Sequence, residues 1–175
     1  KEMKSIEDFK GLPIRFFGHG GKALQKLGAS VTQIPGGEIF AALEKRAIEA
    51  SEFSMPAIDT KLGFYKIAKY NYFPGWHQQA TLFELLINKK DWESMSDRQR
   101  SLIEMLCMAS TLNTMAWTES IQYKVMMENE TKHGVKNMYW SDEMLGQFKQ
   151  AWEEVAAEEA TKDAFFKTVW EDLQA

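Results

Sequence analysis

The chain has 175 residues, a formal net charge of −4, 45% hydrophobic residues and 26% charged residues. This balance is typical of a folded globular chain and differs from that of a disordered one. A negative net charge without a basic run excludes the positive surface that nucleic-acid binding needs, so we expect no nucleic acid as a partner. No apolar stretch approaches the ~18 uninterrupted residues that span a bilayer, so we expect a chain that is not inserted in a membrane. Cys107 is the single cysteine, which excludes an internal disulfide framework.

Strand-like and helical segments alternate in the first third of the chain. A short helix that begins at Ser5 and ends at Gly11 comes first. The elements expected after it are, in chain order, a strand at 12–17, a helix at 22–27, a strand at 29–34, a helix at 37–48 and a strand at 50–54. This alternation predicts an α/β fold with a parallel sheet and right-handed crossovers.

The segment from 55 to 79 is rich in aromatic residues, Pro and Gly, and only 62–68 looks regular. Such a composition is typical of a binding loop. An apolar segment at 81–88 then predicts a further strand, which ends at Lys89-Lys90-Asp91.

One long helix dominates the remaining sequence. Ser96 and Gln99 have the spacing of a capping box, and apolar residues then recur at helical spacing until Gly134. At 1.5 Å per residue this helix would be about 50 Å long, so we predict that it crosses between two lobes. The elements expected after it are a strand at 135–140, a helix from Ser141 to about 159 and a last short helix that includes 165–170.

Hydrolytic and redox signatures are missing, but one glycine-rich segment matches a known motif. Residues 18–23, Gly-His-Gly-Gly-Lys-Ala, fit the Gly-x-Gly-x-x-Ala turn of dinucleotide-binding domains. The next strand ends in Gln33-Ile34-Pro35, without the acidic residue that would hold a ribose hydroxyl. A tight turn from strand to helix is the simpler interpretation. The alternative is a nucleotide-binding domain, or an α/β enzyme with His19 or His77 as its acid or base.

Two charged residues stand near the ends of predicted strands. Arg15 interrupts an otherwise apolar strand, where a guanidinium needs an anionic partner and suits a carboxylate. That partner is either a ligand, because open α/β sheets bind ligands beyond the carboxyl ends of their strands, or Glu52 of the same chain. Glu52 in turn could pair with Arg15 or bind a hard cation. The turn at 72–78 presents aromatic and amide groups together and is a third candidate for the site.

Three segments in this order carry a resemblance to a known family. They read Leu-Pro-Ile-Arg at 12–15, Ile-Pro-Gly-Gly-Glu-Ile-Phe-Ala-Ala-Leu-Glu-Lys at 34–45 and Ile-Glu-Ala-Ser-Glu-Phe at 48–53. In combination they resemble the DctP-like periplasmic solute receptors of TRAP (tripartite ATP-independent periplasmic) transporters. Lys-Leu-Gly-Phe-Tyr-Lys at 61–66 and Tyr-Phe-Pro-Gly-Trp at 72–76 are similar to the branch that binds 2-oxo acids. The resemblance runs from about residue 5 to the end of the chain.

The resemblance implies a lobe of the type II periplasmic-binding-protein fold, with a parallel-rich sheet flanked by helices and one long lobe-spanning helix. Residues 1–95 would form the α/β lobe with ligand-facing strand ends. Residues 96–175 would form the connecting helix, one strand and the C-terminal helices. Because family members are considerably longer than this chain, we expect the N-terminal lobe to be absent from it.

The resemblance also implies a function. The chain would belong to a periplasmic receptor, not an enzyme, that binds a 2-oxo or dicarboxylic acid and delivers it to the TRAP membrane permease subunits. By position, Arg15 resembles the arginine that pairs with the substrate carboxylate. The other side chains implied at the substrate are Phe17, Phe53, Trp76 and His77.

A cation, Na⁺ or Ca²⁺, that bridges ligand and protein is a further implication. Its expected ligands are Glu52, the backbone oxygen of Phe53 and Gln78. Gln78 stands where the oxo-acid branch can carry a glutamate. We therefore expect the loss of that negative charge to weaken cation binding.

Overall fold

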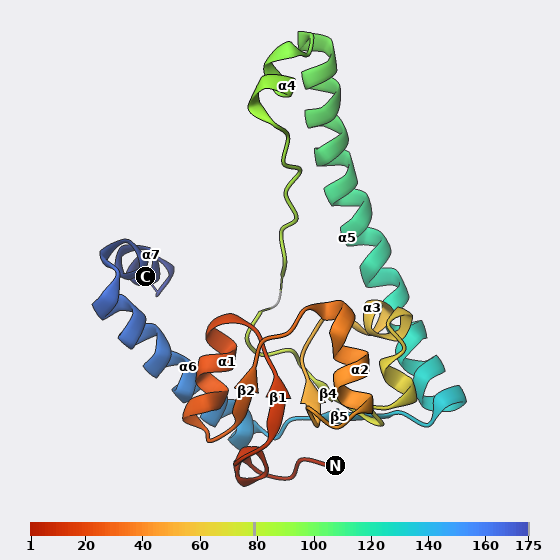
Figure 1. The fold of residues 1–175 in the computed structure, drawn as a ribbon, viewed down its shortest axis with the longest axis vertical. Coiled ribbons are helices and arrows are strands. Elements are labelled where there is room, and N and C mark those ends of the chain that lie inside the picture. Colours follow the sequence, from red (N-terminus) through yellow and green to blue (C-terminus); the bar gives the residue numbers. More distant parts are fainter. Residues whose placement is uncertain (79, 175) are drawn as a thin grey trace.

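The computed structural model of the chain describes residues 1–78 and 80–174. A mixed α/β body lies at the base of the molecule, and a long helical arm rises from it (Figure 1). A second, shorter helical extension leaves the other side of the body and ends at the C-terminus.

A three-stranded parallel sheet forms the centre of the body. Its strand order is β2-β1-β3, and α1 and α2 connect successive strands. The bounds are Pro13–Arg15 for β1, Gly18–Lys26 for α1, Ser30–Thr32 for β2, Ile39–Glu44 for α2 and Ala50–Ser51 for β3. In the register, Ile14 of β1 lies opposite Val31 on one side and Ala50 on the other. The expected α/β class and parallel sheet are confirmed, although each strand is shorter than its apolar run.

A second, two-stranded parallel sheet joins distant parts of the chain. It pairs β4, Tyr70–Phe73, with β5, Lys136–Tyr139, so that Tyr70 lies opposite Lys136. Between β3 and β4 the chain forms α3, Pro56–Lys61, and a 3-10 turn at Phe64–Lys66. The prediction of a largely irregular segment at 55–79, of which residue 79 lies outside the described residues, was therefore wrong both for α3 and for β4. Its four residues become a strand only because β5, far away in sequence, supplies the hydrogen-bonding partner.

The arm consists of an extended segment, a short helix and a long helix. The predicted strand at 81–88 was wrong, because residues 80–88 run along the arm and no described strand pairs with them. An apolar run becomes a strand only where a neighbour satisfies its backbone groups. Helix α4, Lys89–Ser94, begins at Asn88, whose side chain accepts a hydrogen bond from the backbone N–H of Lys90.

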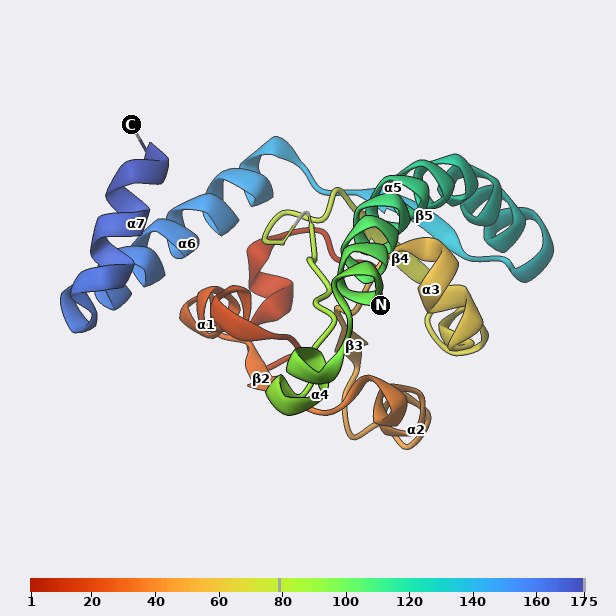
Figure 2. The same cartoon turned by 90° about the horizontal axis from the view of Figure 1, so that it is seen from above.

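The predicted long helix is confirmed as α5, Asp97–His133, with 37 residues. The capping box of Ser96 and Gln99 starts it, and Gly134 ends it in the left-handed conformation at φ 66°. Helix α3 packs against α5 at the base of the arm, where the backbone N–H of Ala57 donates to the side-chain oxygen of Gln122 (Figure 2).

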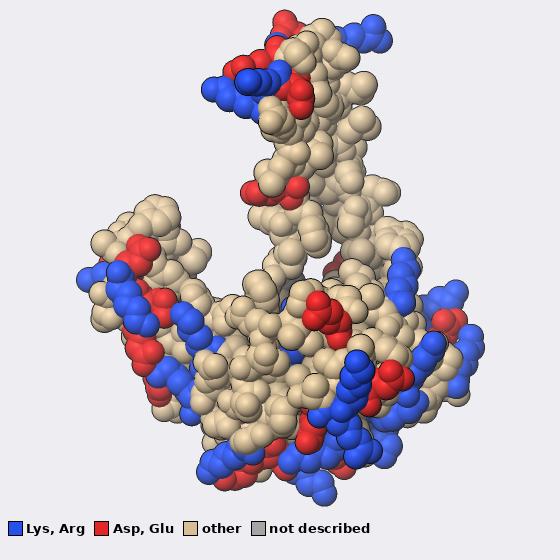
Figure 3. Space-filling view, in the orientation of Figure 1, with Lys and Arg blue, Asp and Glu red and all other residues tan. Residues whose placement is uncertain are grey.

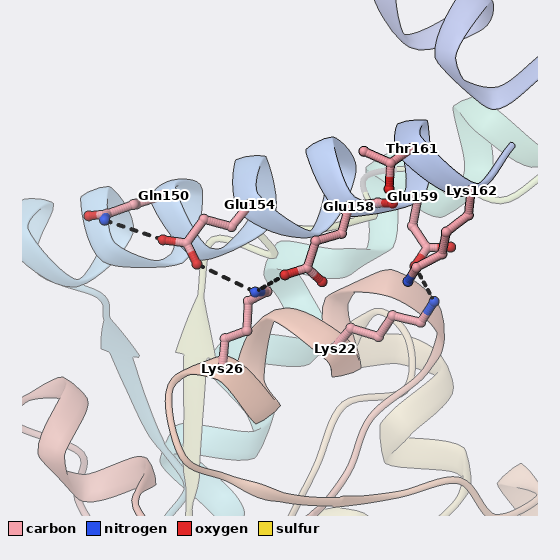
Figure 4. A network of polar contacts seen from close by, with 8 residues as sticks. All are labelled: Lys22, Lys26, Gln150, Glu154, Glu158, Glu159, Thr161 and Lys162. Atoms are coloured by element: carbon pink, nitrogen blue, oxygen red, sulfur yellow. Dashed lines mark hydrogen bonds and ion pairs between the residues drawn. The ribbon is translucent and has the colours of Figure 1, made fainter. Parts of the chain in front are cut away.

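Two helices follow β5, as predicted. Helix α6, Asp142–Lys162, begins at Ser141, and α7, Ala164–Gln174, completes the chain. Lys22 and Lys26 of α1 point toward carboxylates of α6, and the Lys22 Nζ to Glu159 Oε1 distance is 2.9 Å (Figure 4). These ion pairs are partly exposed and contribute little each, and they join two lysines one turn apart on α1 to the second half of α6.

Two apolar clusters of buried side chains lie in the body, and the larger one holds β1 in place. The larger one joins β1 to α1 and α6 and contains, among others, Leu12, Ile14, Phe16, Leu24 and Phe148. The smaller one lies under α2 and contains Ile39, Leu43, Ile48 and Phe64. Leu12, Ile14 and Phe16 thus fix β1 and its carboxyl end in the larger cluster. Among the described helices, none combines the length and hydropathy needed to cross a membrane.

Candidate ligand-binding site

Arg15 is the last residue of β1 and is only 7% exposed. Its Nη1 atom donates to the Glu52 carboxylate at 2.9 Å and to the Glu52 backbone oxygen, and its Nε atom donates to the backbone oxygen of Ile34 at 3.3 Å. Glu52, which the sequence offered as an internal partner for Arg15, is therefore its partner in the structure. The contact between Arg15 and Glu52 is called the buried ion pair below.

The fixed guanidinium keeps further capacity to bind an anion. No described residue accepts a hydrogen bond from Nη2 of Arg15. Two aromatic rings lie beside the guanidinium, Phe53 at 5.5 Å and Phe17 at 5.7 Å from its carbon to the ring centroids. Phe17 is largely exposed. A guanidinium held by three protein contacts and flanked by aromatic rings is preorganised for a carboxylate, because little side-chain entropy remains to be lost.

His77 approaches the buried ion pair from the other side of Glu52. Its side chain is 9% exposed, and its Nε2 atom lies 3.7 Å from Oε1 of Glu52. At that distance Nε2 is buried without a hydrogen bond to any described residue. Buried polar atoms are normally paired, so this nitrogen favours a bound polar group between His77 and Glu52.

The two remaining predicted residues, Trp76 and Gln78, both have their main contacts outside the buried ion pair. Trp76 stacks on Phe148 at 4.7 Å between ring centroids and also contacts Phe16, so it packs mainly on the larger apolar cluster. Gln78 is exposed and donates to Oγ1 of Thr81 at 2.8 Å, so its amide turns away from Glu52. The structure therefore brings together Arg15, Phe17, Glu52, Phe53 and His77, whereas no hydrogen bond or ion pair among the described residues joins Gln78 to them.

Asp59 of α3 is a titratable group near this site that the sequence did not reveal. Burial raises the pKa of its carboxyl to about 7, opposed by a hydrogen bond from the Ser54 backbone and helped to a smaller extent by the negative charge of Glu52. Its Oδ1 atom is buried and has no hydrogen-bond partner among the described residues. In the sequence it lies in a segment predicted to be irregular, and only the structure places it in the first turn of α3 after Pro56.

The oxygen atoms here suit a hard cation in kind but not in number. Glu52 supplies a carboxylate and Phe53 a backbone carbonyl, and both are the ligand types that Na⁺ and Ca²⁺ prefer. The described residues contain no group of three or more His, Cys, Asp or Glu side chains placed to hold a metal ion. A cation would need further oxygens from a bound acid, from water or from another part of the protein.

A parallel sheet ends in a buried, partly paired arginine, and a long helix leaves the same body, which is an arrangement that suits one lobe of a solute-binding protein. The chain matches the model of DctP, bacterial extracellular solute-binding protein, family 7, over residues 1–163. The chain belongs to this family of TRAP solute-binding proteins, which are receptors and not enzymes. The enzyme and nucleotide-binding alternative for residues 18–23 is thereby set aside, and in the structure these residues form the start of α1.

Similar proteins agree with this assignment. The chain is 31% identical over 175 residues to a monocarboxylate 2-oxoacid-binding periplasmic protein of a Nostoc species, a match that covers 100% of this chain and 48% of the relative. A TRAP solute-binding protein of Colwellia psychrerythraea, solved with bound calcium and pyruvate, superposes with a TM-score of 0.88 at 30% identity and covers 99% of this chain and 53% of that one. One of Pseudoalteromonas atlantica, solved with bound sodium and pyruvate, has a TM-score of 0.88 at 28% identity and the same coverage, 99% and 53%. The chain thus spans about half the length of these proteins.

Proposed function

We propose that the chain is one lobe of a periplasmic TRAP receptor that binds a small 2-oxo acid through Arg15 and delivers it to the membrane permease subunits. The observation that carries the proposal is the geometry of Arg15, which is buried at a strand end, held on one side by Glu52 and Ile34, and without a described partner at Nη2. The relatives whose names or bound ligands are 2-oxo acids favour that class over dicarboxylic acids.

Arg15 would bind the carboxylate of the acid. An anion that leaves water is stabilised when it gains charge-assisted hydrogen bonds from a planar guanidinium that is already oriented. Phe17 and Phe53 would exclude water from this contact, which strengthens the electrostatic attraction. The His77 Nε2 atom lies within reach of a polar group placed over Glu52 and would help to fix the oxo end of the acid.

A cation would be held by Glu52 and the backbone oxygen of Phe53, with Gln78 as a third ligand after its side chain turns. When bound, it supplies positive charge between two negative groups, the Glu52 carboxylate and the acid. Because Glu52 already neutralises Arg15 in part, that added charge would leave the guanidinium available to the ligand. The two family relatives solved with bound sodium and pyruvate and with bound calcium and pyruvate support this role.

The opposite wall of the cleft would come from a second lobe that packs on the arm. Large apolar side chains of the arm are exposed, including Leu82 at 88%, Phe83 at 91%, Leu86 at 85% and Leu112 at 73%. Figure 3 shows that charged residues gather at the tip of the arm and over the lower body, whereas the shaft between them is mostly uncharged. An apolar surface of this extent is expected to be covered in the complete receptor.

Calorimetric titration of the complete receptor tests the proposal. Pyruvate and longer 2-oxo acids should give saturable heat without product, whereas propanoate, which lacks the oxo group, should bind at least about 10-fold more weakly. Saturable binding of dicarboxylic acids with none of pyruvate would assign the receptor to another acid. Turnover of any of these compounds would contradict the receptor function.

A further inference from the structure

Two glycines lie against the rings that flank the buried ion pair. We propose that Gly36 and Gly20 are positioning residues of the acid-binding site, because their lack of a side chain allows the Phe53 and His77 rings to sit where they do. Gly36, through Phe53, would thereby set the length of the acid that the site accepts. The inference rests on the function proposed above and adds a determinant of specificity to it.

Gly36 begins the 3-10 turn Gly36–Glu38, just after the Ile34 carbonyl that holds the Arg15 guanidinium. A methyl group added at Gly36 would strike the far edge of the Phe53 ring, and its distance to the Cζ atom would be 2.7 Å. Carbon atoms in contact lie about 3.5 to 4.0 Å apart, so the ring would have to move by roughly 1 Å. One loop thus fixes both the guanidinium and the ring 5.5 Å from it.

The Phe53 ring has few directions in which to move. On one side it meets the buried Phe64 ring edge-on, at 6.1 Å between centroids. On another it faces the Arg15 guanidinium. A ring pushed away from Gly36 therefore shifts across the space above Arg15, where the carbon chain of a bound acid would lie. Binding sites depend on placement to within about 0.5 Å, so a shift of roughly 1 Å is enough to exclude the longer acids first.

Gly20 has the corresponding place beside His77. It lies in the first turn of α1, where an added methyl group would come within 2.9 Å of Cδ2 of His77 and 2.7 Å of Cε1 of Phe16. Phe16 is buried in the larger apolar cluster and cannot easily shift. The methyl group therefore requires a shift of the first turn of α1 as well as of the His77 ring, and the 3.7 Å approach of the His77 Nε2 atom to Glu52 would be lost.

Two neighbouring glycines provide matched controls. A methyl group at Gly37, the next residue of the same turn, or at Gly75, two residues before His77, would meet no atom within 4 Å. Neither residue has a positive φ, so alanine fits both backbones. Gly37→Ala changes the same turn as Gly36→Ala, and Gly75→Ala changes the segment that carries His77. Neither variant would displace the Phe53 ring or the His77 ring.

The experiment measures dissociation constants of pyruvate, 2-oxobutanoate and 2-oxopentanoate for the complete receptor, with melting temperatures recorded for every variant. Gly36→Ala should raise the ratio of the 2-oxopentanoate constant to the pyruvate constant about 10-fold, since one methylene in an apolar pocket changes affinity by about 10-fold or more. Gly37→Ala should leave this ratio within about 2-fold. Gly20→Ala should weaken the binding of all three acids by about 10-fold without changing the ratio. Gly75→Ala should leave all three dissociation constants near their wild-type values.

A double-mutant cycle separates positioning from a general effect on the turn. Leucine lacks the far ring atoms that the methyl group would strike, so Gly36→Ala should have no effect on the ratio in the Phe53→Leu background. If Gly36→Ala fails to fold, Phe53→Tyr tests the same contact, because its hydroxyl extends from the Cζ atom that faces Gly36. The same rise in the ratio is expected.

The possible results separate a failure of the proposed function from a failure of the inference about Gly36. A wild-type receptor that binds none of the acids overturns the proposed function. Wild-type binding together with an unchanged ratio in Gly36→Ala, a ratio that moves toward the longer acids, or an equal effect in the Phe53→Leu background overturns the inference alone. A crystal structure of Gly36→Ala in which the Phe53 ring has not moved overturns it independently of any ligand.

Discussion

Replacement of Arg15 by alanine affects stability and ligand affinity by different routes, and both can be estimated. The change removes the hydrogen bonds to Ile34 and Glu52 and leaves the Glu52 carboxylate, which is largely buried, without its cation. Breaking a buried ion pair costs about 3 to 5 kcal/mol, and because part of Glu52 still reaches water we expect about 2 to 4 kcal/mol here. For 175 residues that corresponds to a fall in melting temperature of about 4 to 16 °C, and the fall is smaller in the complete receptor because the entropy of unfolding grows with chain length.

The same change removes the group expected to bind the acid. A desolvated carboxylate left without its charged partner loses about 2 to 5 kcal/mol, which is roughly 30-fold to several thousand-fold in affinity. Arg15→Lys should retain only part of the affinity for the acid, because an ammonium group cannot reproduce the planar, two-pronged hydrogen bonding of a guanidinium. Lys10→Ala is the control, since Lys10 pairs with Glu7 in an exposed ion pair and should change the melting temperature by no more than a few degrees.

The assay is thermal melting and acid titration on the same Arg15→Ala preparation of the complete receptor, with affinity taken from the folded fraction. Lower melting temperature together with the large loss of affinity is expected. Lower melting temperature with wild-type affinity would refute the reasoning, because Arg15 would then serve only as the internal partner of Glu52.

Three further predictions follow from the structure. The isolated 175-residue chain should bind 2-oxo acids more weakly than micromolar and should hold no stoichiometric Na⁺ or Ca²⁺, because one wall supplies too few oxygens; tight binding by calorimetry, or a full equivalent of metal by elemental analysis, would contradict this. The pKa of Asp59, raised to about 7 by burial, lies above its unfolded value near 3.8, so its contribution to stability is complete at low pH and is lost as the pH rises between these values. Asp59→Asn should therefore raise the melting temperature more at pH 8 than at pH 5. An equal rise in melting temperature at the two pH values would refute the raised pKa of Asp59. Gly134→Ala should cost about 1 kcal/mol, because φ is 66° at the end of α5, whereas Gly146→Ala inside α6 should not destabilise; equal melting temperatures for the two would contradict this.

The sequence predicted correctly those helix ends that are set by residues within one turn of the helix. The capping box at Ser96 and the glycine at 134 start and end α5 as predicted, because both act within one turn of the helix. The strand expected at 81–88 did not form and β4 was missed, for the same physical reason. A strand depends on a partner that can lie anywhere in the sequence, and only the folded chain shows that Tyr70 meets Lys136.

The candidate site was predictable in its charges but not in its contacts. The strand-end rule placed Arg15 and Glu52 together, and the structure shows that they pair. Residue type alone could not show that Trp76 packs on Phe148 while Gln78 turns toward Thr81. The positions at which glycine is required by a neighbouring ring depend on side-chain packing across the chain, which no sequence motif records.

The position of the ligand carboxylate is the most direct test of the central claim. A crystal structure of the complete receptor with pyruvate should show the carboxylate accepting hydrogen bonds from the Arg15 guanidinium, including its Nη2 atom, beside the Phe17 and Phe53 rings. A carboxylate bound elsewhere, with Arg15 still paired only to Glu52 and Ile34, would contradict the account.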